Sequence, residues 1–188
     1  MDAIAELTAE NGYGATKIGD IVRRAGVARK TLYDNFEGKE EVFLSTFDAA
    51  VEESIEQVEA ACAVVGKDDW EARLQAGLAA FLRFVAERPA LARMCLIEAL
   101  SATPAATERY EVAMQRYVEL TAATTPDSDL LPETIDETLV GGVAWIVYQQ
   151  IRREEAEVAE GLLAELSEFM LSPFRGAADA AARRRRGA

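Results

Sequence analysis

A group of basic and hydroxyl side chains near the amino end has the types and spacing needed to contact a polyanion. Arg29, Lys30 and Thr31 are consecutive, and Tyr33 and Lys39 follow soon after. Arginine and lysine can hydrogen-bond to guanine edges, threonine can touch a thymine methyl group, and hydroxyl and ammonium groups can donate to phosphates. These side chains therefore predict contacts with duplex DNA.

Short amphipathic helices must present these side chains. The hydrophobic spacing predicts a first helix over Asp2–Asn11 and a second helix with Thr16 as its N-cap. The Ala25-Gly26-Val27 turn separates it from a third helix at about Ala28 to Asn35, and Gly38 opens a long fourth helix. This order is typical of a helix-turn-helix, in which the start of the later helix enters the major groove. The alternative is that the same pattern serves packing alone.

The same segment resembles a known family. The resemblance to the tetracycline-repressor (TetR) family covers about the first 45 residues and is carried by Gly12-Tyr13, Ala15-Thr16, Asp20-Ile21, Ala25-Gly26-Val27, Thr31-Leu32-Tyr33, Phe36 and Lys39-Glu40. It implies a homodimeric, ligand-responsive regulator, most often a repressor, that binds a palindromic operator. Such regulators usually have a further turn and a basic arm upstream. The sequence departs from the pattern at Thr8, where an aromatic is usual, at Ala28, where Ser or Thr caps the helix, and at the acidic Asp34.

The expected DNA contacts come from the residue types and from this resemblance together. The resemblance implies that Arg29, Lys30, Thr31, Tyr33, Asn35 and Lys39 occupy DNA-contacting positions. The full expected set is Thr16, Lys17, Ala28, Arg29, Lys30, Thr31, Tyr33, Asn35 and Lys39. In this set Lys39 and Thr16 are expected to hold phosphates at helix starts.

The composition excludes most other chemistry. The chain of 188 residues contains no histidine, which removes histidine-based catalysis and histidine metal sites, and its two cysteines, Cys62 and Cys95, are far apart. We therefore expect no cofactor, no metal and no enzyme activity. No apolar run is long enough for a membrane span and no secretory signal is visible, so a cytoplasmic protein is expected.

The net charge of −13 is concentrated away from the expected DNA-binding segment. Residues 1–45 contain 6 Lys/Arg and 8 Asp/Glu, residues 46–172 contain 9 and 24, and residues 173–188 contain 5 and 1. Salt screens charges over about 8 Å under physiological conditions. A distant acidic body therefore opposes DNA binding only weakly.

The rest of the chain is expected to be an all-α ligand-binding and dimerisation domain. Residues 1–46 are the expected DNA-binding domain, 47–172 the effector-binding and dimerisation domain, and 173–188 a disordered basic tail that includes Arg183–Arg186. One helix is expected from Pro89 to Leu100. The residues expected to line an effector pocket are Phe81, Phe84, Met94, Cys95, Glu98, Met114, Tyr117, Trp145 and Tyr148. For each of these the alternative is ordinary core packing, and for Glu98 a neighbouring arginine as partner.

The last two helices are expected to form a homodimer interface. They are placed at about 132–154 and 156–171, with Ser172-Pro173 ending the second. Their apolar faces suit a four-helix contact across a twofold axis, although packing within one chain is the alternative. Two rival functions stay open at this point: a helical ligand-binding dimer that has lost DNA recognition, and an enzyme.

Overall fold

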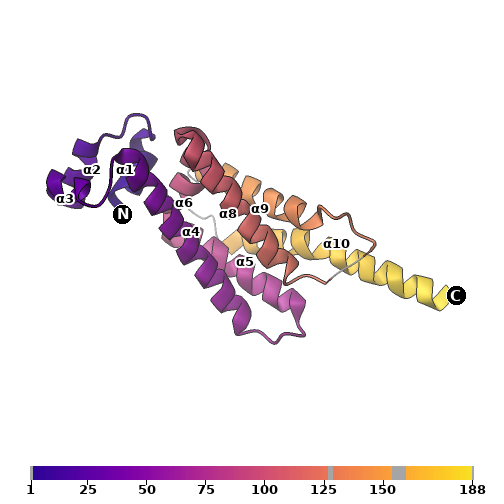
Figure 1. Cartoon of the computed structure of the whole chain (residues 1–188). Coiled ribbons are helices and arrows are strands. Elements are labelled where there is room, and N and C mark those ends of the chain that lie inside the picture. The colour runs from indigo at the N-terminus through magenta and orange to yellow at the C-terminus, as the bar shows by residue number, and fades with distance from the viewer. Residues whose placement is uncertain (1, 127–128, 154–159, 188) are drawn as a thin grey trace. The chain divides into compact units, whose positions relative to one another are not determined.

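The computed structural model describes residues 2–126, 129–153 and 160–187, and every regular element in them is a helix. The expected all-α class is therefore confirmed. In chain order the elements are α1 (Asp2–Asn11), α2 (Ile18–Ala25), α3 (Arg29–Tyr33), α4 (Lys39–Ala63), α5 (Trp70–Glu87), α6 (Pro89–Arg93), the π-helical η1 (Met94–Glu98), α7 (Ala99–Ala102), α8 (Pro104–Ala122), α9 (Ile135–Arg153) and α10 (Glu160–Gly187) (Figure 1).

The helices form two compact units. The first unit combines Met1–Ser54 with Phe84–Ala113, and the second combines Ile55–Arg83 with Met114–Ala188. Helices α4, α5 and α8 each cross from one unit to the other. The units do not follow the expected border near residue 46, because α6 and η1 pack against α1. The helix-turn-helix and the segment around η1 therefore share one unit.

Helices α1 to α3 gather around the first turns of α4 (Figure 1). Their core consists of fully or nearly fully buried apolar side chains, namely Ile4, Leu7, Ile21, Leu32, Val42 and Phe43. Gly26 ends α2 in the left-handed conformation at φ +67°, which only glycine adopts at low cost. The conformation of this glycine thus fixes how α3 leaves α2.

The start of α2 differs from the prediction. Thr16 was expected to cap this helix, but Lys17 occupies the N-cap and no side chain caps it. The Thr16 hydroxyl instead donates to the Gly12 carbonyl at 2.9 Å, and the side chain is 2% exposed. The prediction that Thr16 caps α2 is therefore wrong, because the hydroxyl closes the preceding turn.

The segment after Pro89 is not one α-helix. Pro89 does begin a helix, as its fixed φ favours. At Met94–Glu98 the backbone changes to π-helical geometry before the α-helix resumes at Ala99. The π turn contains one more residue than an α turn, and such turns are frequent at functional sites.

Helix α10 continues through the proline that was expected to end it. Pro173 lies inside the helix, so the predicted stop at Ser172-Pro173 is wrong, and residues 173–187 are helical rather than a disordered tail. The turn after the proline is fixed by long-range contacts. Phe174 is 4% exposed and packs edge-on against Trp70, and Arg175 forms an ion pair with Glu71 at 2.6 Å. These contacts compensate for the hydrogen bond that proline cannot donate.

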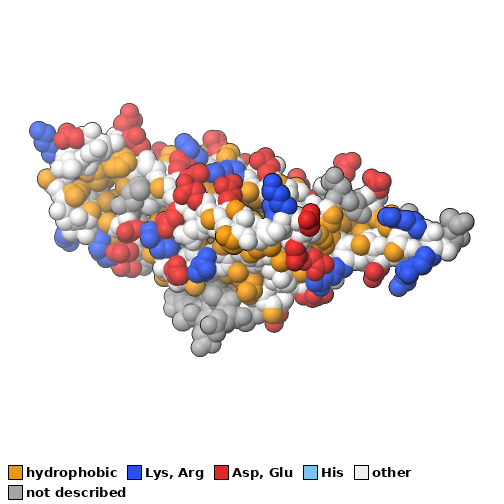
Figure 2. Space-filling model, turned by 90° about the horizontal axis from the view of Figure 1, so that it is seen from below, with side chains coloured by type: hydrophobic (Ala, Val, Ile, Leu, Met, Phe, Trp, Pro, Cys, Tyr) orange, Lys and Arg blue, Asp and Glu red, His pale blue; other side chains and the backbone are white. Residues whose placement is uncertain are grey.

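Helix α9 begins at Ile135, a turn later than expected, and the expected junction of the last two helices at 154–159 lies outside the described residues. Leu139, Val143 and Val147 form its buried stripe. Acidic and basic side chains are interspersed on the face in Figure 2, and basic ones gather at the end of α10. None of the described helices has an apolar stretch long enough to cross a membrane.

Candidate nucleic-acid interface

Helix α3 exposes one side and buries the other. Arg29, Lys30 and Thr31 are exposed, and Tyr33 is 47% exposed, whereas Leu32 is 5% exposed and anchors the helix to the core. The Arg29 guanidinium lies 5.7 Å from the centre of the Tyr33 ring, so the two side chains share one surface. Ala28 is the N-cap, as expected, in an extended conformation and without a side-chain cap.

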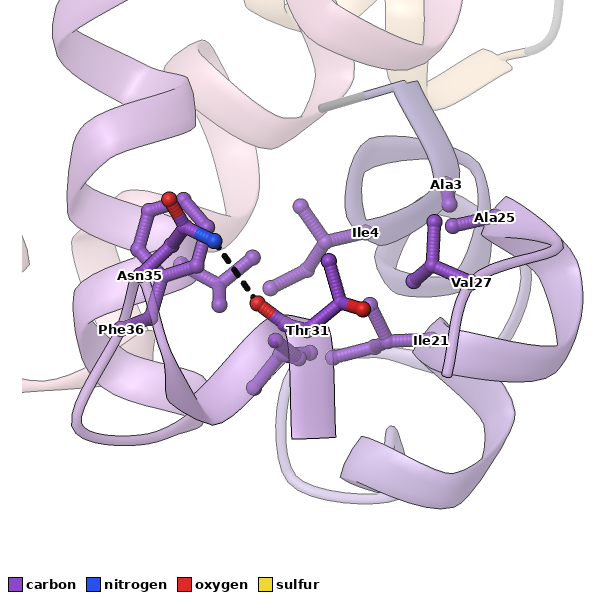
Figure 3. A pocket seen from close by; sticks show the side chains of 10 residues that line it. Ala3, Ile4, Ile21, Ala25, Val27, Thr31, Asn35 and Phe36 are labelled. Carbon is purple, nitrogen blue, oxygen red and sulfur yellow. Dashed lines mark hydrogen bonds between the residues drawn. The ribbon is translucent and has the colours of Figure 1, made fainter. Parts of the chain in front are cut away.

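A small apolar cavity lies beneath α3. It has a volume of about 190 Å³ and is lined by residues of α1 to α4 and the turn between α2 and α3. Figure 3 shows Ile4 and Ile21 pointing into it, with Val27 at one side and Phe36 at the other. The Asn35 side-chain amide donates to the Thr31 carbonyl at 2.8 Å. One N–H of the Asn35 amide therefore binds the end of α3. The side-chain carbonyl oxygen of Asn35 takes no part in this bond, and the side chain is exposed.

Some of the cations near α3 are paired with acids. Arg24 donates to Glu6 at 2.8 Å and to Glu10 at 2.8 Å, which ties α2 to α1 and lowers the pKa of Glu10. Arg23 pairs with Asp20 on its own helix. In the described part of the chain, no ion pair involves Lys17, Arg29 or Lys30, and all three are exposed. Near α3, these three side chains are therefore available to a polyanion.

Lys39 points inward to the turn between α1 and α2. Its ammonium group donates to the carbonyls of Tyr13 at 2.8 Å and Thr16 at 3.0 Å, and it lies 3.9 Å from the centre of the Tyr13 ring. Burial lowers the pKa of Lys39. An ammonium group has three donors, so one remains beyond these two bonds. Of the two predicted phosphate contacts, Thr16 is buried and Lys39 is largely engaged in holding this turn.

The residues expected to form an effector pocket lie in both units. In the second unit Phe81 and Tyr117 pack edge-on at 5.5 Å, and Trp145 stacks on Tyr148 at 5.4 Å between ring centres. Trp145 is 57% exposed, so this chain does not bury it. Met114 is half-buried.

In the first unit Phe84 and Met94 are buried, at 5% and 0% exposure, and Cys95 and Glu98 are half-buried. Burial raises the pKa of the Cys95 thiol to about 12. One Glu98 carboxylate oxygen accepts a hydrogen bond from the Tyr13 backbone N–H at 3.2 Å. Its observed partner is thus a backbone group rather than an arginine.

Sequence reasoning missed Arg93, which lies directly before η1. Its Nε–H is buried and has no hydrogen-bond partner among the described residues. A buried donor without a partner costs free energy, so such a group is a candidate for binding an anion. A single arginine in an apolar helix gives no periodic signal that would mark it. Among the described residues, no three His, Cys, Asp or Glu side chains come together as a metal site.

Comparison with known proteins agrees with the helix-turn-helix geometry. Residues 1–46 match the family model described as bacterial regulatory proteins, tetR family. These matched residues, here called the TetR-family head because they match that model, include α1 to α3 and the start of α4. The "Fatty acid metabolism regulator protein" of Bacillus subtilis (strain 168) is 39% identical over 59 residues, a stretch that spans 31% of this chain and 30% of that relative.

About nine-tenths of the chain also has the fold of solved transcriptional regulators. FadR from Bacillus subtilis, solved in complex with stearoyl-CoA, aligns with a TM-score of 0.81 and 20% identity over 91% of this chain and 95% of that one. The fatty acid degradation regulator FadR from Bacillus halodurans aligns with a TM-score of 0.81 and 18% identity over 90% and 95%. PfmR from Thermus thermophilus, a TetR family transcriptional regulator, aligns with a TM-score of 0.71 and 21% identity over 90% and 92%.

Proposed function

We propose that this TetR-family chain is a homodimeric repressor that binds a palindromic operator through α3 and releases it when an effector of the fatty-acyl class binds. The observation that carries the proposal is the exposure of Arg29, Lys30 and Thr31 on a short helix whose other side is anchored by Leu32. That arrangement offers donors to a major groove while the helix stays fixed to its core.

The individual DNA contacts divide into two kinds. Arg29 and Lys30 are proposed to contact base edges, where a good bidentate pair contributes about 1–3 kcal/mol of discrimination. Lys17 and Tyr33 are proposed to contact phosphates, which position the protein without reading sequence. Ala28, Thr31 and Asn35, on α3 or at its ends, are exposed as well and complete the proposed surface.

A homodimer through α9 and α10 is supported by apolar side chains that one chain leaves open to solvent. Trp145 is 57% exposed, Ile146 37% and Phe169 42%. Gly142 lies against the Phe169 ring, which brings the exposed parts of the two helices together. Large apolar side chains grouped in this way are typical of an interface. To reach successive major grooves of a palindrome, the two α3 helices of a twofold dimer must lie about 34–36 Å apart.

The fatty-acyl class of effector is proposed from the relatives and from one side chain. The matching Bacillus subtilis relative is a fatty acid metabolism regulator, and FadR from that organism was solved with stearoyl-CoA. An acyl chain needs an apolar site, and within the first unit the buried aromatic and methionine side chains Phe84 and Met94 suit one. Arg93, whose buried Nε–H has no partner among the described residues, is the proposed contact for the anionic part of such a ligand.

The test is a binding titration of the full chain on DNA that flanks its gene, repeated over a salt series. Wild type should bind a palindromic site, and its affinity should fall steeply with salt because phosphate contacts release counterions. Arg29→Ala should lose about 5–150-fold on the preferred site and change its base preference. Lys17→Ala should weaken all sequences alike, and Lys67→Ala, which removes an exposed lysine of the second unit, should change nothing.

The effector is tested in the same assay with stearoyl-CoA, free stearate and coenzyme A alone. Stearoyl-CoA should lower DNA affinity, and Arg93→Met should weaken that response. Coenzyme A alone should have no effect, because it lacks the acyl chain. A folded dimer that binds no flanking DNA would instead indicate a ligand-binding protein without DNA recognition. DNA binding that none of the three probes changes would reject the fatty-acyl class.

A further inference from the structure

The π turn η1 brings a charged side chain from outside the TetR-family head onto the turn that follows α1. Glu98 is the last residue of η1, and its Oε2 accepts a hydrogen bond from the Tyr13 N–H at 3.2 Å. The neighbouring Gly12 has φ +80°, and a Cβ placed there would lie 3.8 Å from the same oxygen. The carboxylate therefore lies directly beside the Gly12–Tyr13 peptide, where the chain turns from α1 toward α2.

Lys39 also binds Tyr13, through the carbonyl group rather than the N–H. Its ammonium group donates to the Tyr13 carbonyl at 2.8 Å and lies over the Tyr13 ring. The ring also packs edge-on against Phe43, with 5.0 Å between ring centres. Both polar backbone groups of Tyr13 thus bind charged side chains, one from η1 and one from α4. Hydrogen bonds to charged groups are stronger than neutral ones.

The orientation of Glu98 depends on the helical register before it. Successive residues of an α-helix are about 100° apart around the axis. The π turn η1 contains one more residue than an α turn. A change from π to α geometry would therefore rotate the residues that follow the turn by about 100° around the helix axis, relative to the residues that precede it. Such a rotation turns the Glu98 carboxylate away from the Tyr13 N–H.

We infer that Glu98 is a positioning residue for DNA binding. Its carboxylate fixes the α1–α2 turn by accepting the hydrogen bond from the Tyr13 N–H, and the π geometry of η1 keeps the carboxylate oriented toward that N–H. This inference rests on the proposed function, because it explains how a ligand near η1 changes the presentation of α3. Arg93 immediately precedes η1, so an anion bound there acts at one end of the π turn while Glu98 acts at the other. All of these residues lie in the first unit.

The first test measures backbone hydrogen exchange in the full chain without DNA. In Glu98→Ala the Tyr13 amide should exchange at least about tenfold faster, which is the scale of a lost hydrogen bond to a charged acceptor. The Gly12 amide, which donates to the Thr8 carbonyl at 2.8 Å, should be unchanged. Glu98→Gln keeps an acceptor oxygen and should restore most of the protection. Glu108→Ala removes an exposed acid from the same unit and should have no effect.

The second test measures affinity for the flanking DNA with and without stearoyl-CoA. Glu98→Ala should bind DNA about 5–150-fold more weakly, a typical coupling between sites, and should respond less to stearoyl-CoA. Unchanged DNA affinity and unchanged response in Glu98→Ala would overturn the inference, as would an unchanged Tyr13 exchange rate. If wild type binds no DNA while Tyr13 exchange still depends on Glu98, the proposed function fails and the contact itself stands. The two failures are therefore distinguishable.

Discussion

A methyl group added at Gly142 should bring the pair formed by α9 and α10 no gain in stability and up to a moderate loss, whereas the same change at Gly141 should stabilise it. A Cβ at Gly142 would lie 2.8 Å from Cζ and 2.9 Å from Cε1 of Phe169, while a Cβ at Gly141 would meet nothing within 4 Å. Ordinary contacts of this kind begin at 3.4 Å. The Phe169 ring must therefore move away when Gly142 becomes alanine, and nothing has to move for Gly141.

The expected magnitudes follow from two opposing effects. Replacing a glycine inside a helix by alanine stabilises it by about 1 kcal/mol. Overpacking costs about 1–3 kcal/mol. Gly141→Ala should therefore gain about 1 kcal/mol, and Gly142→Ala should range from neutral to a loss of about 2 kcal/mol. For a chain of this length Tm changes by roughly 2–4 °C per kcal/mol.

The assay is thermal unfolding of the two variants at one fixed protein concentration, because dimer formation makes Tm depend on concentration. Phe169→Ala removes the ring, and in that background Gly142→Ala should become as stabilising as Gly141→Ala. If Gly142→Ala raises Tm as much as Gly141→Ala in the wild-type background, the Phe169 ring does not lie against Gly142, and the reasoning is wrong.

Three further predictions concern single buried groups. Thr8→Val should raise the free energy of unfolding by about 1 kcal/mol in a denaturant titration, because the Thr8 hydroxyl is buried without a partner among the described residues; a loss of stability would mean that the hydroxyl has a partner. Phe174→Ala should lower the free energy of unfolding by about 3–5 kcal/mol, since the ring is 4% exposed against Trp70; a change below about 1 kcal/mol would show that α10 is not packed after Pro173. Burial raises the pKa of Cys95 to about 12, so its thiol should react more slowly with iodoacetamide at about pH 8 than free cysteine does. The rate is measured on variants that keep only one of the two cysteines, Cys62 or Cys95.

The helix-turn-helix could be predicted because its signals are local. The apolar spacing of Ile4, Ile21 and Leu32 and the glycine at position 26 lie within a few turns of one another. The hydrogen-bond partners of the polar side chains nearby could not be predicted in the same way. Lys39 and Glu98 both bind the backbone of Tyr13, and Glu98 is 85 residues away in sequence. Which partner a charge finds depends on tertiary packing.

The wrong predictions for the segment after Pro89 and for the end of α10 have different physical origins. The π turn at Met94–Glu98 has an apolar pattern that suits an α-helix equally well, so the sequence contains no signal for the extra residue. At Pro173 the local signal favours the end of a helix, since proline disfavours a helix interior. It was outweighed by Trp70 and Glu71, which hold the next turn of α10 from a distant part of the chain.

The passage of α10 through its proline has a practical consequence for producing this protein. A shortened version that stops at Ser172, where a proline suggests a safe boundary, would remove Phe174 and Ala177, which are 4% and 8% exposed. The Trp70 side chain would then meet water instead of a ring. Newly uncovered aromatic surface favours aggregation. Such a truncation is expected to lower soluble yield, and expression designs should retain the helix to its end.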